Sequence, residues 1–162
     1  MNTSIKRSKS VSSRTGIHIS SPIGDLSLFE QEGRLIALEF ASLSGTLLSS
    51  PLLEEAVRQL NAYFAGRLKQ FDLPLAPTGT PFEQKAWNTL LEIPYGQTLS
   101  YSQQAVQMGC PKAHRAVGSA NGKNPLPIFI PCHRVIRRDH TLGGYAGGLS
   151  VKSFLLSLEK GA

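Results

Sequence analysis

Apolar and polar residues alternate in short segments along residues 17–40, and the turn signals PIG (22–24) and EG (32–33) separate these segments. In a strand, side chains two residues apart point to the same side of the sheet. In the last segment, three apolar residues have this spacing: Ile36, Leu38 and Phe40. The pattern predicts a small antiparallel sheet.

From Pro51 the hydrophobic period changes to that of a helix, with Gly66 as a suitable stop. Four apolar residues fall on one stripe: Leu53, Val57, Leu60 and Phe64. The Pro- and Gly-rich residues 72–79, DLPLAPTG, then predict a linker. The first part of the chain is therefore expected to be an α/β domain, a small antiparallel sheet plus a helix, over residues 15–76.

The second part, residues 80–162, is expected to be mainly α-helical. Two of its helices should begin with capping boxes, Thr80 with Glu83 and Ser100 with Gln103, and Gly109 should end the second. Another short helix follows after Cys110-Pro111. Its two faces hold an apolar set, Ala113, Ala116, Val117 and Ala120, and an opposite set, Lys112, Arg115 and Ser119.

Two short helices joined by a brief turn predict a helix-turn-helix motif, which is a common way to bind DNA. The small residues of the second helix would let its backbone approach a groove closely. An ordinary α-helical hairpin gives the same pattern, so the pattern alone leaves both interpretations open.

A last helix is expected with Ser150 as its N-cap and with a stripe of apolar residues. The stripe consists of Val151, Phe154, Leu155 and Leu158. Glu159 lies beside it, and a carboxylate turned inward needs a partner because an unpaired buried charge is costly. We expect His133 to be that partner; a frayed, exposed last turn is the alternative.

Length and charge narrow the class of protein. The 162 residues suit one domain or two small ones, and 41% hydrophobic residues can form a core. No apolar run reaches the length of a membrane span, and the first residues lack the apolar region of a secretory signal, so we expect a cytoplasmic protein and no membrane partner.

The net charge of +6 is concentrated in residues 1–14, expected to be a disordered basic arm, and in residues 80–162. This distribution fits a polyanionic partner, or simply a soluble basic surface.

The chain has two cysteines, Cys110 and Cys132, which we expect to be free thiols. No set of Cys and His residues completes a zinc-binding pattern, so no metal is expected.

The run NPLPIFIPCHRV (124–135) fixes the backbone with three prolines just before Cys132. A cysteine needs a base to become a nucleophile, and that base needs an orienting group. Cys132, His133 and Glu159 could fill these roles in a cysteine hydrolase or a thiol transferase, or could be together by coincidence.

The order of several motifs resembles the O6-alkylguanine-DNA alkyltransferases, also called methylated-DNA–protein-cysteine methyltransferases. The motifs are RAVGSANGKNPLPIF, IPCHRV, GGYAGG and LLSLE. The match is dense from Thr80 to Glu159, whereas the first half resembles the variable N-terminal domain of that family more loosely.

The resemblance implies a repair protein for double-stranded DNA. It would flip O6-alkylguanine, and also O4-methylthymine, out of the duplex and transfer the alkyl group irreversibly to Cys132, once per molecule and without a cofactor. The resemblance further implies that His133 removes the thiol proton through a water, that Glu159 orients His133, and that Asn124 braces the turn. We expect no obligatory protein partner and a monomer, and leave open whether copies cluster along DNA.

The same resemblance assigns residues that contact DNA and the base. Arg115 would enter the base stack, Tyr101 would help to rotate the phosphate and contact the base, and Lys112 and Ser119 share the DNA-facing side. The carbonyl groups of Cys132 and Val135 would accept hydrogen bonds from the guanine amine. Tyr145 and Ala146 would close over the base and direct a backbone N–H at O6.

Two other functions share these motifs. One is an alkyltransferase-like protein that binds the lesion without repairing it, and Cys132 argues against it because such proteins replace the cysteine. The other is a regulatory DNA-binding protein, for which no additional cysteine cluster or second DNA-binding domain is evident. Ala146 stands where a serine is common, and RRDHT (137–141) lies where the active-site loop varies, so tolerance of bulky adducts is open.

Overall fold

The computed structural model describes residues 14–43 and 45–161. The predicted basic arm therefore lies outside the described residues, except for Arg14. That residue is the first of strand β1, and its guanidinium lies 4.0 Å from the centre of the Phe29 ring. Arg14 is thus part of the sheet, a correction to the predicted boundary of the arm.

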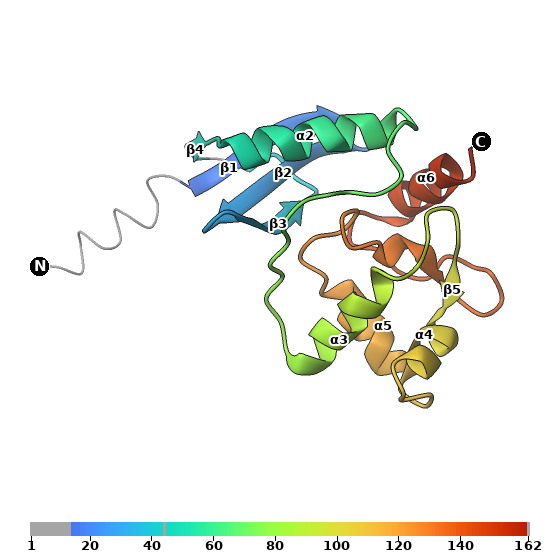
Figure 1. Cartoon of the computed structure of the whole chain (residues 1–162). Coiled ribbons are helices and arrows are strands. Elements are labelled where there is room, and N and C mark those ends of the chain that lie inside the picture. The colour runs from blue at the N-terminus through green and yellow to red at the C-terminus, as the bar shows by residue number, and fades with distance from the viewer. Residues whose placement is uncertain (1–13, 44, 162) are drawn as a thin grey trace, which may run out of the picture.

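A four-stranded sheet forms the first half (Figure 1), in the order β3-β2-β1-β4. Its strands are β1 (Arg14–Ser21), β2 (Gly24–Gln31), β3 (Arg34–Glu39) and β4 (Leu47–Leu48). The pairs β1–β2 and β2–β3 are antiparallel and the turns fall where PIG and EG predict them. The short β4 pairs with β1 in parallel, so the sheet is mixed rather than purely antiparallel.

The predicted buried face of the third segment is right at Leu38 and wrong at Ile36, because the register shifts. Phe29 pairs with Ala37 but Glu30 pairs with Leu35, which leaves Ile36 unpaired as an extra residue. An extra residue reverses the alternation of faces. Leu35 and Leu38 are therefore the buried residues of β3, whereas Ile36 and Phe40 are only partly buried.

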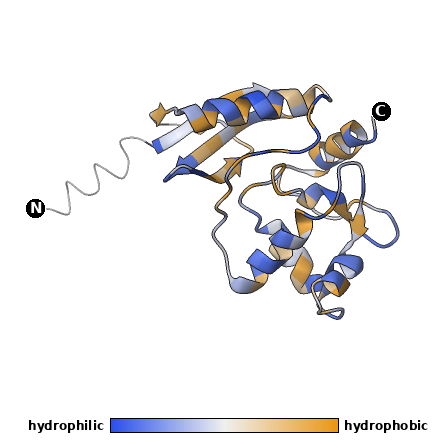
Figure 2. Cartoon of the chain, in the orientation of Figure 1, coloured by the Kyte–Doolittle hydropathy of each residue, from blue (hydrophilic) through white to orange (hydrophobic). Residues whose placement is uncertain are grey.

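Helix α2 (Pro51–Phe64) lies across the sheet (Figure 1). Ser50 caps its N-terminus by accepting a hydrogen bond from the N–H of Leu53, and Gly66 follows with the left-handed φ of 76° that only glycine adopts freely. Leu53 and Leu60 are completely buried, and Figure 2 shows hydrophobic and hydrophilic stretches along the same helix. One face of α2 thus closes the core of the first half.

Residues 72–79 do more than link the two halves. The N–H of Leu35 donates to Pro74, and the N–H of Ala76 donates to Leu35, so this segment runs along the open edge of β3. The core is also shared, because buried residues of both halves form one hydrophobic cluster.

Four helices and a two-stranded parallel sheet build the second half. They are α3 (Pro81–Leu90), β5 (Leu99–Ser100), α4 (Tyr101–Gln107), α5 (His114–Gly122), β6 (Val135–Ile136) and α6 (Leu149–Glu159), with a 3₁₀ turn, η1 (Cys132–Arg134), before β6. Both predicted capping boxes are present, at Thr80 and Ser100. The predicted fold class, an α/β half followed by a helical half, is confirmed.

The predictions for two helices need correction. Helix α6 is capped by Gly148 rather than Ser150, and Phe154 is 37% exposed while Lys152 is completely buried. In α5, Val117 and Ala120 are buried as predicted, but Ala116 is exposed. Within the described ranges, no helix is long and apolar enough to cross a membrane.

Candidate active site

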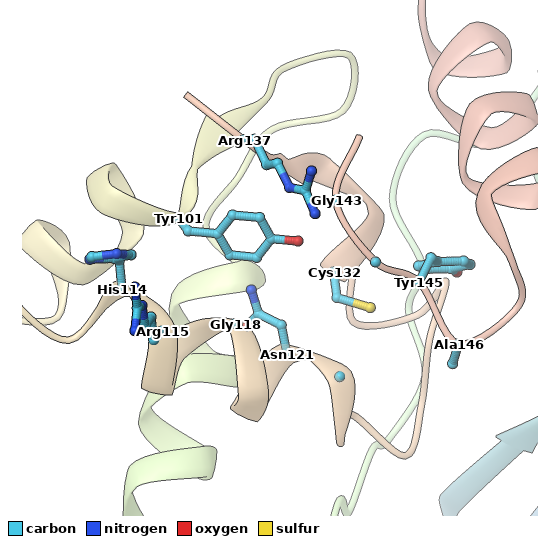
Figure 3. Close-up of a pocket in the computed structure, with 12 residues that line it drawn as sticks. Tyr101, His114, Arg115, Gly118, Asn121, Cys132, Arg137, Gly143, Tyr145 and Ala146 are labelled. Carbon is cyan, nitrogen blue, oxygen red and sulfur yellow. The ribbon is translucent and has the colours of Figure 1, made fainter. Parts of the chain in front are cut away.

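A cavity of about 600 Å³ opens beside Cys132, between α5 and the loop that precedes α6 (Figure 3). Figure 3 shows the Tyr101 ring on one side of it and Tyr145 on the other. The lining residues are Tyr101, His114, Arg115, Gly118, Asn121, Gly122, Cys132, Arg137, Gly143, Gly144, Tyr145 and Ala146. The cavity therefore joins five residues predicted to act in the site: Tyr101, Arg115, Cys132, Tyr145 and Ala146.

The approach to Cys132 is held rigidly. The Asn124 side chain donates to the carbonyl of Ile130 (2.8 Å) and accepts from the N–H of Leu126 (2.9 Å), so it ties the two ends of the turn together. Inside the turn, Ile128 has a φ of 76°, which is unfavourable for a β-branched residue and costs about 1–3 kcal/mol. The amide of Asn124 and the burial of Ile128 hold this strained backbone in place.

Cys132 lies at the base of the cavity and is only 8% exposed. Burial raises the pKa of its thiol, while a hydrogen bond from Asn124 and the charge of Lys152 oppose that rise. The net direction is upward, so the resting cysteine is a thiol rather than a thiolate. A base must therefore take the proton as the sulfur reacts.

His133 follows Cys132 within the 3₁₀ turn and is completely buried. Its Nε2 lies 2.7 Å from Oε2 of Glu159. Burial lowers the pKa of His133, and the contact with Glu159 opposes this only in part, so the ring is neutral at rest. A neutral ring facing an ionised carboxylate carries its proton on Nε2 and donates it to Glu159.

The other ring nitrogen of His133, Nδ1, has no hydrogen-bond partner among the described residues, although it is buried. With the proton on Nε2, Nδ1 keeps a free lone pair. This atom is the one that can accept the proton of Cys132, directly or through a water.

Glu159 is the last residue of α6 and is 6% exposed. Burial alone would raise its pKa, but hydrogen bonds from His133, Arg134 and Tyr63 hold the pKa at about 2. Arg134 donates through Nε to Oε1 (2.8 Å) and through a second nitrogen to Oε2 (3.0 Å). Tyr63, from the first half of the chain, donates its hydroxyl to Oε2 at 2.6 Å.

Lys152 supports the loop between β6 and α6. Its ammonium donates to the carbonyls of Val135 (2.7 Å) and Gly144 (3.2 Å) and also to that of Leu142. Burial lowers the pKa of Lys152 to about 8. The three carbonyls compensate the desolvation of the ammonium, which explains how a lysine occupies a buried position of α6.

The carbonyl of Val135 is thus already engaged by Lys152. A carbonyl oxygen has two lone pairs, so one hydrogen bond leaves acceptor capacity for a guanine amine. The predicted role of Val135 remains a proposal.

Residues of the first half support the same loop. The ring of Phe40 packs edge-on against Tyr145, with 5.7 Å between ring centres. A Cβ at Gly147 would lie 2.9 Å from the Phe40 ring, so this close approach requires glycine. Gly143 makes a similar approach to Tyr101, whose hydroxyl oxygen would be 2.7 Å from an added Cβ.

The exposed face of α5 borders the cavity. Arg115 is exposed and lines the cavity, Ser119 is exposed on the same helix, and Lys112 is exposed in the turn that precedes α5. Tyr101, at the start of α4, is half-buried, and its ring would lie 3.6 Å from a Cβ at Gly118. Basic and small residues therefore surround the route into the cavity.

Three residues whose side chains make the buried hydrogen bonds around the site were missed in the sequence: Tyr63, Arg134 and Lys152. Arg134 lies inside IPCHRV, directly after the predicted base His133, and this position could have indicated its role in the site. Lys152 occupies an inward position, i−3 from Leu155, which the helical period alone could have indicated. Tyr63 gave no local signal, because its partner lies 96 residues later.

Across the residues that the structure describes, no group of three or more His, Cys, Asp or Glu side chains is placed to hold a metal ion.

Comparison with known proteins agrees with this geometry. Residues 81–161 match the family described as 6-O-methylguanine DNA methyltransferase, DNA binding domain, and residues 17–77 match the ribonuclease-like domain of the same family. A protein of Methanosarcina barkeri named methylated-DNA–protein-cysteine methyltransferase is 49% identical over 151 residues, covering 88% of this chain and 94% of that protein. A constitutive methyltransferase of the same name from Bacillus subtilis is 46% identical over 150 residues, covering 86% of this chain and 91% of that protein.

A solved structure gives the same result. Mycobacterium tuberculosis OGT, determined in complex with DNA, superposes with a TM-score of 0.84 at 47% identity. The superposition covers 91% of this chain and 93% of that one. Both halves of the chain match in order, and we conclude that the chain belongs to the 6-O-methylguanine DNA methyltransferase family.

Proposed function

We propose that this protein repairs DNA by direct reversal, as a methylated-DNA–protein-cysteine methyltransferase. It binds double-stranded DNA that contains O6-alkylguanine, rotates the damaged nucleotide out of the helix, and moves the alkyl group to Cys132. O4-methylthymine is a second substrate of the same kind, since its alkyl group is also attached to a ring-carbonyl oxygen.

In the transfer, a bond forms between the Cys132 sulfur and the alkyl carbon while the bond between that carbon and O6 breaks. The thiol proton passes to Nδ1 of His133. The departing guanine takes up one proton from water while His133 returns its extra proton to water, so the net change moves one proton from the thiol to guanine. The product is a thioether, which no group in the cavity can cleave. Each molecule therefore reacts once.

The residues around the cavity have distinct tasks in this proposal. Arg115 occupies the space that the flipped base leaves, because its planar guanidinium stacks on neighbouring bases. Tyr101 turns the phosphate and contacts the base, and Lys112 and Ser119 contact the DNA backbone along α5. Backbone groups of Val135, Tyr145 and Ala146 hold the base and stabilise charge on O6.

One observation carries the proposal: Cys132 lies in a cavity large enough for a base, with His133 and Glu159 hydrogen-bonded behind it. A cavity of about 600 Å³ is within the usual range for small-molecule sites. The chain is organised for this as an N-terminal domain of residues 15–76 and a DNA-binding domain of residues 80–162. It acts in the cytoplasm as a monomer without an obligatory partner.

The deciding experiment is the intact mass of the protein after incubation with a duplex that carries one O6-methylguanine, followed by peptide mapping. We expect a gain of one methyl group per chain, located on Cys132. The variant Cys132→Ala should bind the duplex and gain no mass, whereas Cys110→Ser, which removes the other thiol, should gain one methyl group like the wild type. Tight binding of the lesion without any gain in mass would instead indicate a lesion-binding protein.

A further inference from the structure

A tyrosine of the N-terminal domain contacts the proton path of the active site. Tyr63 lies in the last turn of α2, is 1% exposed, and places its hydroxyl 2.6 Å from Oε2 of Glu159. Figure 1 shows α2 and α6, which carry these two residues, in the first and second halves of the chain. This hydrogen bond therefore joins the two halves of the protein at the active site.

The Tyr63 ring is fixed before it makes this contact. Aromatic rings pack around it at centre distances of 5.2 to 6.3 Å, and they belong to Phe64, Phe71 and Tyr95. A ring held on several sides loses little further entropy when its hydroxyl forms a hydrogen bond. The direction of the Tyr63 hydroxyl is thus set by the core of the molecule.

The carboxylate that receives this hydrogen bond takes its orientation from the donors around it. Glu159 is the last residue of α6, and a helix restrains a side chain less in its final turn than in its middle. Its Oε2 accepts from three donors: His133, Arg134 and Tyr63. Arg134 comes from the same turn as His133, so Tyr63 is the donor of Oε2 that fixes the carboxylate from outside that turn.

We propose that Tyr63 is a positioning residue for alkyl transfer, which acts by holding the Glu159 carboxylate in the orientation that keeps the His133 proton on Nε2. This inference rests on the proposed function. It makes the N-terminal domain a direct contributor to the transfer step rather than only a support for the DNA-binding half.

Loss of the Tyr63 hydroxyl has a definite consequence. Oε2 then keeps two donors, and the carboxylate becomes more mobile and more basic. A more basic carboxylate stabilises the protonated form of His133. The other titratable or charged groups around His133 are Arg134, Lys152 and Tyr145, and the substitution leaves all three in place. The pH below which the transfer rate falls should be higher than in the wild type. The rate itself should also be lower, because Nδ1 is less often free and correctly oriented.

The test compares Tyr63→Phe with the wild type on two substrates, free O6-benzylguanine and a duplex with one O6-methylguanine. Free base needs no DNA binding and no flipping, so it reports the transfer step alone. We expect a similar loss of about ten-fold on both substrates, the size of one hydrogen bond to a charged group. Tyr95→Phe is the matched control, since its hydroxyl faces the carbonyl of Leu158 (3.5 Å) rather than the carboxylate, and it should keep the wild-type rate.

A double mutant separates positioning from simple destabilisation. If Tyr63 acts through Glu159, then Tyr63→Phe with Glu159→Gln should react no more slowly than Glu159→Gln alone. Thermal unfolding of each variant shows that the rates refer to folded protein. The proposal is overturned if Tyr63→Phe lowers only the melting temperature, if only the duplex reaction slows, or if the two losses multiply. A wild-type protein that gains no alkyl group would refute the function itself, a distinct result.

Discussion

Cys132 and His133 carry no charge before the reaction. Burial raises the pKa of the thiol and lowers the pKa of the imidazole, so both shifts oppose a resting thiolate–imidazolium pair. Cysteine enzymes that rest as an ion pair have the opposite shifts. Proton removal and attack on the alkyl carbon are therefore coupled in this site, and the sulfur becomes nucleophilic only as the substrate reacts.

This uncharged pair predicts the pH dependence of transfer to Cys132. The rate with free O6-benzylguanine should fall only when His133 is protonated, with a midpoint below the ordinary histidine pKa of 6.5. Above that limb the rate should be nearly flat, since the thiol pKa lies above 9.0. Second-order rates measured across this range check the prediction. A rate that rises ten-fold per pH unit up to 8 would mean that free thiolate is the reacting species.

Helices α4 and α5 are joined by a reciprocal pair of buried amides. Gln104 donates to Asn121 (3.1 Å) and accepts from it (2.8 Å), and it also donates to the carbonyl of Ala86 (3.2 Å). These bonds fix the angle between the two helices of the motif and connect both to α3. Because Asn121 lines the cavity, the pair also links α4 and α5 to the site.

Breaking this pair should destabilise the helical half. Gln104→Ala leaves the Asn121 amide buried without its partner, which costs about 1–3 kcal/mol in the free energy of unfolding. Urea unfolding of the variant gives this value. Gln107→Ala, an exposed position at the end of the same helix, should change stability by less than about 0.5 kcal/mol. Equal effects of the two substitutions would show that the amide pair contributes nothing.

Elements whose signals are local were predictable from the sequence. The capping boxes at Thr80 and Ser100 set two helix starts correctly, because caps act within one turn. The shifted register of β3 was not predictable, since its extra residue depends on the pairing with β2. The helical period could have indicated the inward position of Lys152, but not its partners: three carbonyls, from β6 and from the loop that precedes α6, surround the buried ammonium.

The candidate site shows the same contrast between local signals, which were predictable, and long-range contacts, which were not. The motif IPCHRV and the inward position of Glu159 indicated the Cys132, His133 and Glu159 cluster, and the structure brings His133 and Glu159 within 2.7 Å. No sequence pattern indicates which aromatic residue of the first half reaches Glu159. That contact depends on how the two halves pack together.

At the scale of the whole molecule, the buried charge of Glu159 connects the two halves of the chain. Its carboxylate joins α2, the turn after the proline-rich segment, and α6. The contacts hold its pKa at about 2, below the ordinary value of 4.5. The unfolded chain therefore binds a proton more readily than the folded protein does, so the stabilisation is complete above pH 4.5 and is lost as the pH falls toward 2.

Acid unfolding should therefore depend on this one side chain. In Glu159→Gln, the free energy of unfolding should vary less between these two pH values than it does in the wild type. Glu55 offers a matched control, since its pKa is also about 2 but its partner Arg58 is an exposed neighbour on α2. Solvent screens that surface pair, so Glu55→Gln should leave the acid dependence nearly unchanged. Urea midpoints measured at several acidic pH values test both, and equal effects would contradict the prediction.

Phe40 belongs to the first half of the chain, and its contacts with Tyr145 and Gly147 support part of the cavity wall. A smaller side chain at position 40 gives the loop room to retreat, and a larger one pushes it inward, while every residue that touches the base stays the same. Selection for larger or smaller adducts can therefore act on a residue outside the cavity. We therefore expect a substitution at Phe40 to change the range of adducts that the cavity accepts, while Cys132, His133 and Glu159 keep their contacts.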